Sequence, residues 1–284
     1  MPAVMKRRGR IVAILTGAVT ITVLGVAAYL EWPNLCFRYR FEPLGANTYG
    51  LPEYRHRQTG IVFVRLPGGT FWMGAQKEDP KGHNYDPEAQ EDEGPVHEVT
   101  LSPFLIAKYE VTQRQWTRVM EANPSKFMGD DNRSVENVSW NDIQEFEAKT
   151  GLTLPTEAQW EYACRAGTTG PFAGTGNLDD MGWYGDYYRG STHSVGQKAP
   201  NGFGLYDMHG NVLEWCEDFY DDTFYSKPEA AGSDPVSSAG SEDRVIRGGG
   251  WYNDARNCRS ANRNGDYPLI RFSYLGFRPS MPSP

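Results

Sequence analysis

The 284-residue chain has little cysteine and no excess of positive charge, and each scarcity excludes a class of protein. Its four cysteines are too few for a small disulfide scaffold, and they form no Cys-x-x-Cys pair of the kind that binds zinc. The formal net charge of -8 argues against a nucleic-acid partner, because proteins that bind phosphate backbones present an electropositive surface. With 23% charged and 39% hydrophobic side chains, the chain fits neither a disordered acidic tail nor a polytopic membrane protein.

Aromatic and turn-forming residues are abundant instead. The chain has 16 Tyr, 8 Trp and 13 Phe beside 31 Gly and 19 Pro. This mixture favours a large aromatic core wrapped by many turns and loops, and it argues against long helical bundles. We therefore expect a fold with few and short regular elements.

The first part of the chain has the pattern of a membrane anchor. Four basic side chains lie within residues 1–10, an uncharged run covers residues 11–30, and Glu31 follows it. As a helix, that run is about as long as the hydrocarbon core of a bilayer is thick. The basic flank predicts that the N-terminus lies in the cytoplasm. We expect a single-pass membrane protein with an extracytoplasmic domain; a cleaved signal peptide is the alternative, although its apolar region is usually shorter.

The remainder predicts one domain. Residues 31–59 are expected to form a juxtamembrane linker and residues 60–284 a single loop-rich domain, since no low-complexity segment interrupts them. An acidic stretch at residues 78–98 is rich in Gly and Pro, so we expect a solvated loop there, with a cation-binding role as the alternative. Residues 61–66 and 70–73, separated by a Pro-Gly-Gly turn, favour two strands of a hairpin. Beyond residue 167 we expect mostly short strands and turns, with little regular structure, because the segment is rich in Gly, Asn, Asp and Tyr.

Three short helices have clear start signals. Thr112 with Gln115, and Thr156 with Gln159, have capping-box spacing, and Ser139 precedes a third amphipathic segment. Apolar side chains then recur at helical spacing in each segment. These helices are expected to be structural.

Several segments carry a family signature, and they occur in one order along most of the chain. They are KYEVT at 108–112, VENVSW at 135–140, LPTEAQWEYACR at 154–165, NGFGLYDMHGNVLEW at 201–215, RVIRGGGW at 244–251, CRSANR at 258–263 and LGFR at 275–278. Together they resemble the formylglycine-generating enzyme family, also called the sulfatase-modifying factor family, over residues 60–280. The resemblance implies an α+β, C-type-lectin-like fold, while function has to be argued from the site.

The chain departs from the family's oxidases at their copper site. In those oxidases two cysteines after a Gly-Gly-Ser segment bind copper(I), and oxygen then converts a substrate cysteine to formylglycine. Copper(I) prefers soft thiolate ligands. Here residues 251–257 contain no cysteine, and Gly250 stands in place of the serine. The sequence therefore predicts that copper is absent; Cys216 is expected to pack as a small buried hydrophobe, with a redox role as the alternative.

The resemblance also implies a disulfide bond. In the family, the cysteines that Cys164 and Cys258 match are bonded to each other, so we expect a bridge between them in an oxidising compartment. Closing such a loop stabilises a protein by about 4 to 5 kcal/mol through chain entropy. Two free thiols that form a metal or nucleophile site are the alternative.

A structural calcium site is a further implication of the resemblance. The family places a side-chain oxygen, two backbone carbonyls and a carboxylate at positions that match Asp207, Gly210, Val212 and Glu214, and Ca²⁺ prefers such oxygen ligands. Solvent or a basic neighbour would equally relieve two converging carboxylates. A second family site is expected around residues 177–186, without assigned ligands.

Arginines crowd the last part of the domain. They either line a pocket for an anionic or peptide ligand or pair with acidic side chains. They are Arg247, Arg256, Arg259, Arg263, Arg271 and Arg278.

The sequence leaves three functions open, with no catalytic residue assigned. The first is a membrane-anchored extracytoplasmic domain that lacks copper oxidase activity and binds an exported protein, a peptide or a small molecule. The second is an oxidoreductase that converts a sulfatase cysteine to formylglycine, or oxidises another exported substrate, through a non-standard site. The third is a structural role in a surface complex.

Overall fold

The protein is represented by a computed structural model, in which residues 35–284 are described. Two compact units are distinguished, and the larger spans Pro43–Ser283. The expected membrane helix at residues 11–30 lies outside the described residues. Among the residues that the structure does describe, no helix is long and apolar enough to cross a membrane.

A five-stranded sheet forms one side of the larger unit. Its order is β1-β2-β3-β6-β11, and its strands are β1 (Phe41–Ala46), β2 (Pro52–His56), β3 (Val62–Leu66), β6 (Phe104–Ala107) and β11 (Ser280–Pro282). β2 pairs with β3 through Glu53 and Val64. Strands β1 and β2 thus lie within residues 31–59, where we expected a juxtamembrane linker.

The predicted hairpin is not formed. β3 pairs with β6, whereas β4 (Gly69–Met73) pairs with β5 (His97–Leu101) in a separate two-stranded sheet. Gly68 lies between the strands with φ +69°, and a Cβ there would stand 2.2 Å from the Leu101 carbonyl oxygen. This close approach places β4 beside a distant strand, which the local sequence does not reveal.

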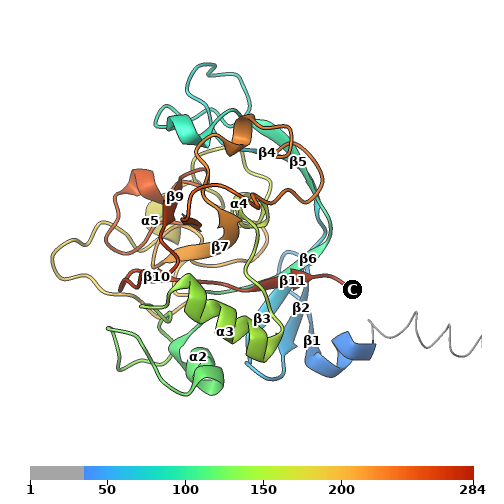
Figure 1. The fold of residues 1–284 in the computed structure, drawn as a ribbon, viewed down its shortest axis with the longest axis vertical. Coiled ribbons are helices and arrows are strands. Elements are labelled where there is room, and N and C mark those ends of the chain that lie inside the picture. Colours follow the sequence, from blue (N-terminus) through green and yellow to red (C-terminus); the bar gives the residue numbers. More distant parts are fainter. Residues whose placement is uncertain (1–34) are drawn as a thin grey trace, which may run out of the picture. The chain divides into compact units, whose positions relative to one another are not determined.

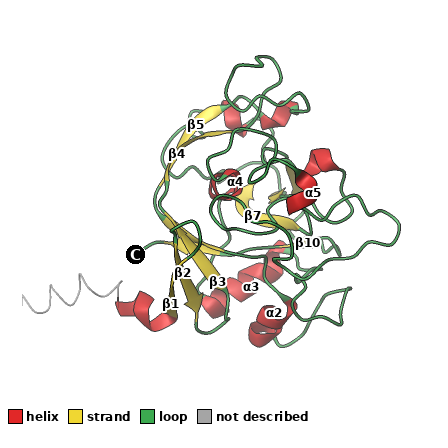
Figure 2. Ribbon diagram, turned by 180° about the vertical axis from the view of Figure 1, so that it is seen from behind, coloured by secondary structure: helices red, strands yellow, loops and turns green. Residues whose placement is uncertain are grey.

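A four-stranded sheet lies beyond residue 167, where we expected short strands and turns with little regular structure. Its order is β10-β7-β8-β9, and its strands are β7 (Leu213–Phe219), β8 (Arg244–Arg247), β9 (Arg263–Asp266) and β10 (Leu275–Gly276). Strands β8, β9 and β10 have four residues or fewer, as expected for short strands, but their assembly into one sheet with β7 was not predicted. Figure 2 shows that loops connect most of the remaining elements.

The three predicted helices are confirmed. They are α2 (Gln113–Met120), α3 (Trp140–Thr150) and α4 (Glu157–Arg165), and each begins with a capping box. Such a cap stabilises a helix start by about 1 kcal/mol. The structure also contains a helical segment at residues 35–40, a short helix α5 (Leu178–Met181) and three 3₁₀ turns, namely η1 (Glu91–Glu93), η2 (Phe224–Ser226) and η3 (Ala255–Cys258).

Helix α4 is the centre of the core. It packs against β4, β5, β7 and β8, and Figure 1 shows it between the two smaller sheets. Trp160 and Cys164 on this helix are completely buried. Helices α2 and α3 pack together, with the rings of Trp116 and Phe146 stacked at 5.6 Å. The expected loop-rich α+β architecture with an aromatic core is confirmed.

Candidate functional site

The segment that holds the copper thiols in the oxidases forms a closed turn in this chain. The Gly250 amide donates to Asn253 Oδ1, and the Asn253 amide donates back to the Gly250 carbonyl, both at 2.9 Å. The Trp251 indole donates to the Ser273 carbonyl at 3.0 Å. Backbone and amide groups therefore close the turn.

Aromatic side chains pack around this turn. Tyr252 lies 4.1 Å from Tyr274 between ring centroids, Tyr274 stacks on Phe272 at 4.9 Å, and Phe127 meets Trp251 edge-on at 5.5 Å. All five rings are partly exposed. Residues 250–257 thus carry no thiol, and partly exposed aromatic rings surround this turn instead.

The predicted calcium residues lie around a buried ion pair. Arg278 donates to both carboxylate oxygens of Glu214 at 2.7 Å, and the Trp160 indole donates to the same carboxylate at 2.8 Å. Asp207 accepts from the Gly196 amide at 2.7 Å through Oδ2, while its buried Oδ1 has no partner. Of the two predicted carboxylate ligands, Glu214 is thus already satisfied and Asp207 is not.

The local charge still favours a cation beside Asp207. Burial, followed by the charges of Asp207 and Glu214, raises the pKa of Glu110 well above its usual value. Burial likewise raises the pKa of Asp207 to about 6. Three buried carboxyl groups therefore accompany one guanidinium, that of Arg278. Of the predicted ligands, Asp207 has a side-chain oxygen without a partner, and the four-ligand set with Gly210, Val212 and Glu214 stays a prediction.

Cys164 and Cys258 are free thiols in the structure, so the predicted bridge is not formed in it. The His209 ring contacts both residues: its Nε2 lies 3.6 Å from Cys164 Sγ, and its Nδ1 is bonded to the Cys258 carbonyl at 2.8 Å. Burial raises the pKa of each thiol to about 12. Protonated, buried thiols make poor nucleophiles and metal ligands.

Cys216 is buried, as we expected for a residue that packs as a small hydrophobe. It lies completely buried on β7, and burial raises the pKa of its thiol well above the usual value. No cluster of three or more His, Cys, Asp or Glu side chains that could hold a metal occurs within residues 35–284.

Buried acids neutralise most of the C-terminal arginines. Arg259 binds Glu93 at 2.6 Å and Asp86 at 2.8 Å, and both acids belong to the stretch that we expected to be a solvated loop. That expectation is wrong for Glu93, which is 0% exposed. Arg263 binds Glu157 through two hydrogen bonds of 2.7 Å. The pairing alternative for the arginines is thus the one found at these sites.

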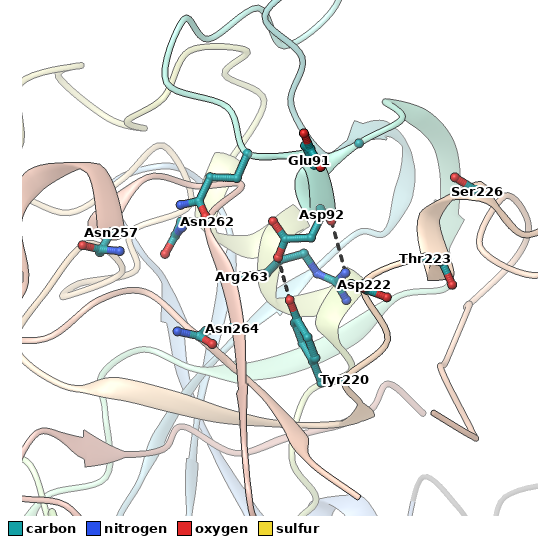
Figure 3. Close-up of a pocket in the computed structure, with 12 residues that line it drawn as sticks. Glu91, Asp92, Tyr220, Asp222, Thr223, Ser226, Asn257, Asn262, Arg263 and Asn264 are labelled. Carbon is teal, nitrogen blue, oxygen red and sulfur yellow. Dashed lines mark hydrogen bonds between the residues drawn. The ribbon is translucent and has the colours of Figure 1, made fainter. Parts of the chain in front are cut away.

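A polar pocket of about 590 Å³ lies at the junction of η1, η2, η3 and β9. Figure 3 shows Tyr220 pointing toward Asp92 beside Arg263, and the Tyr220 hydroxyl donates to Asp92 at 2.7 Å. The pocket is lined by Gln90, Glu91, Asp92, Gly94, Tyr220, Asp222, Thr223, Ser226, Asn257, Asn262, Arg263 and Asn264. We refer to it as the polar pocket. Its lining comes from three distant stretches of sequence, and no local sequence motif predicted the pocket.

Comparison with known proteins defines the family. The family model "Sulfatase-modifying factor enzyme 1-like domain" matches residues 48–280. The formylglycine-generating enzyme of Thermomonospora curvata is 31% identical over 81% of this chain and 96% of its own. The chain belongs to the formylglycine-generating enzyme and sulfatase-modifying factor family, which confirms the resemblance found in its sequence motifs.

Two solved structures share the fold, each with a TM-score of 0.67 and 28% sequence identity. Treponema denticola variable protein 1 matches over 80% of this chain and 98% of its own. PvdO from Pseudomonas aeruginosa matches over 81% of this chain and 98% of its own. The predicted class of fold is therefore confirmed for the larger unit.

Proposed function

We propose that this family member binds a ligand and does not act as a copper-dependent cysteine oxidase. The observation that carries the proposal is the turn at residues 250–257, which contains no cysteine where the oxidases hold copper(I). Copper(I) requires soft, deprotonated sulfur ligands. Burial keeps Cys164, Cys216 and Cys258 protonated, so none of these thiols offers a replacement.

The ligand site that we propose is the polar pocket. Its volume of about 590 Å³ falls within the range of small-molecule sites, which is about 300 to 1,000 Å³. Asn257 in its wall belongs to the same short segment that begins at the aromatic turn. The segment that carries chemistry in the oxidases would thus contribute to ligand binding in this chain.

We also propose a location and a structural ion. Residues 11–30 would anchor the chain with its N-terminus in the cytoplasm and its domain outside, as the basic flank indicates. A structural Ca²⁺ would be held by Asp207 with the carbonyls of Gly210 and Val212, and the unpartnered Asp207 Oδ1 supports this. An exported protein, a peptide or a small molecule would then be the partner.

The decisive experiment is mass spectrometry of a peptide with the Cys-x-Pro-x-Arg motif after incubation with the full chain and oxygen. It is run with and without copper(I), beside an active oxidase of the family. We expect no formylglycine from this chain and full conversion by the control. Conversion would overturn the proposal and favour the oxidoreductase alternative, and Cys216→Ser would then show whether Cys216 takes part.

A further inference from the structure

Arg263 and Tyr220, the two strongest hydrogen-bond donors of the polar pocket, already have acceptors within the protein. The Arg263 guanidinium binds both oxygens of Glu157 and also donates to the backbone carbonyls of Asp92 and Asp221. The Tyr220 hydroxyl donates to Asp92. Burial and that hydrogen bond raise the pKa of Tyr220, so the hydroxyl keeps its proton. The strongest donors of the lining are therefore unavailable to a ligand.

Acceptor atoms face the pocket without partners. Asn262 is only 7% exposed, and its amide nitrogen donates to Glu93 at 3.3 Å, which turns its carbonyl oxygen away from that carboxylate. This oxygen accepts no hydrogen bond from the part of the chain that the structure describes. Within the same residues, Glu91 and Asp222 form no ion pair, and both are exposed. A ligand that fits must donate hydrogen bonds to these acceptors.

The charge of the pocket lining also favours a ligand that donates hydrogen bonds. Glu91, Asp92 and Asp222 contribute carboxylates, whereas the only lining cation, Arg263, is neutralised by Glu157. The pocket is thus negatively charged at neutral pH, and it attracts positive charge.

The spacing of the carboxylates argues against a bare metal ion and favours an organic cation. No cluster of three or more metal-binding side chains exists among residues 35–284, so these carboxylates do not meet at one point. A second pocket of about 560 Å³ shares Gln90, Glu91, Gly94 and Ser226 with the polar pocket. The two adjoining pockets give room for an elongated molecule.

We propose that the polar pocket binds an organic cation with more than one ammonium or guanidinium group. Spaced N–H donors on such a molecule match the spaced carboxylates and the Asn262 carbonyl oxygen. A free polyamine and a basic peptide segment share this chemistry. The inference rests on the proposed binding function and names the ligand class of the same site.

The test is calorimetric titration of the full chain with two probes, spermidine and a capped tri-arginine peptide. Glucose serves as the uncharged control. We expect at least one cation to bind, with affinity that falls as salt increases, and no binding of glucose. Binding of spermidine alone identifies a polyamine site, and binding of the peptide alone identifies a basic-peptide site.

Paired variants separate the pocket from general surface charge. Glu91→Gln and Asp222→Asn should each weaken binding about fivefold, because each removes one partly exposed charge contact worth about 1 kcal/mol. Glu242→Gln removes an exposed acid that does not line the pocket, and it should leave binding unchanged. Thermal melting of each variant establishes that it is folded.

Two results would overturn the inference: no binding of either cation at about millimolar concentration, or equal weakening by Glu242→Gln and the pocket variants. Neither bears on the formylglycine assay. A chain that makes no formylglycine and binds neither cation loses only the ligand class, whereas formylglycine production would defeat the proposed function itself.

Discussion

The guanidinium of Arg278 donates to both carboxylate oxygens of Glu214 at 2.7 Å, and both side chains are fully buried. Glu214 lies on β7, while Arg278 follows β10, which pairs with β7 in parallel. The ion pair therefore links the segment after β10 to strand β7 of the four-stranded sheet. Burying either charge alone is strongly unfavourable.

Glu214→Gln should destabilise the protein by about 3 to 5 kcal/mol, because it removes the carboxylate that accepts both hydrogen bonds of the buried Arg278 guanidinium. Chemical denaturation measures the change. Glu145→Gln is the matched control: its partner Lys149 is 44% exposed, so it should cost less than about 1 kcal/mol. An equal loss of unfolding free energy in both variants would show that the buried ion pair contributes no more to stability than the exposed pair does.

Calcium binding at Asp207 predicts a chelator-sensitive melting temperature. Excess EGTA should lower the melting temperature of the full chain, because removing an ion that binds only the folded state reduces stability. Asp207→Asn should abolish this response, while Glu242→Gln should retain it. Identical melting curves with and without chelator would count against the ion.

Stability should depend on pH through buried carboxyl groups. Burial raises the pKa of Glu136 to about 7, and its Oε2 has no partner. Burial also raises the pKa of Glu147 and of Asp218 to about 7. The folded state then binds more protons than the unfolded state between the ordinary carboxyl pKa and about 7, so stability increases as pH falls through that range.

The melting temperature should accordingly rise from about pH 8 to about pH 6. His209 acts in the opposite direction at lower pH, since burial lowers its pKa to about 4 and the unfolded chain takes up that proton first. Glu136→Gln should reduce the rise, because the glutamine cannot ionise. A melting temperature that is independent of pH in this range would contradict the assignment.

The burial of Cys164 and Cys258 predicts a specific pattern of alkylation. Neither should react with iodoacetamide in the folded protein, whereas partly exposed Cys36 should react. In denaturant without reductant, both buried residues should become labelled, as free thiols do. Labelling that requires reduction would instead establish the disulfide that the family resemblance implies.

Local signals predicted some elements and missed others for a common reason. Thr112, Ser139 and Thr156 cap three helices as their spacing indicated, because a capping box is made by residues three positions apart. The prediction of a hairpin between β3 and β4 was wrong, because Gly68 permits a turn that places β4 beside β5, about thirty residues later in the chain. Strand pairing of this kind depends on contacts that no short window contains.

The sequence by itself determined the family, the aromatic loop-rich architecture and the absence of thiols at residues 251–257, since ordered motifs and composition are properties of the chain alone. Only the tertiary structure decided how the charges are arranged. It showed that Arg278 neutralises Glu214, that Glu93 is buried against Arg259, and that three distant stretches form the polar pocket. The physical reason is that the energy of a charge depends on burial and on its neighbours in space, and both are fixed only when remote segments meet.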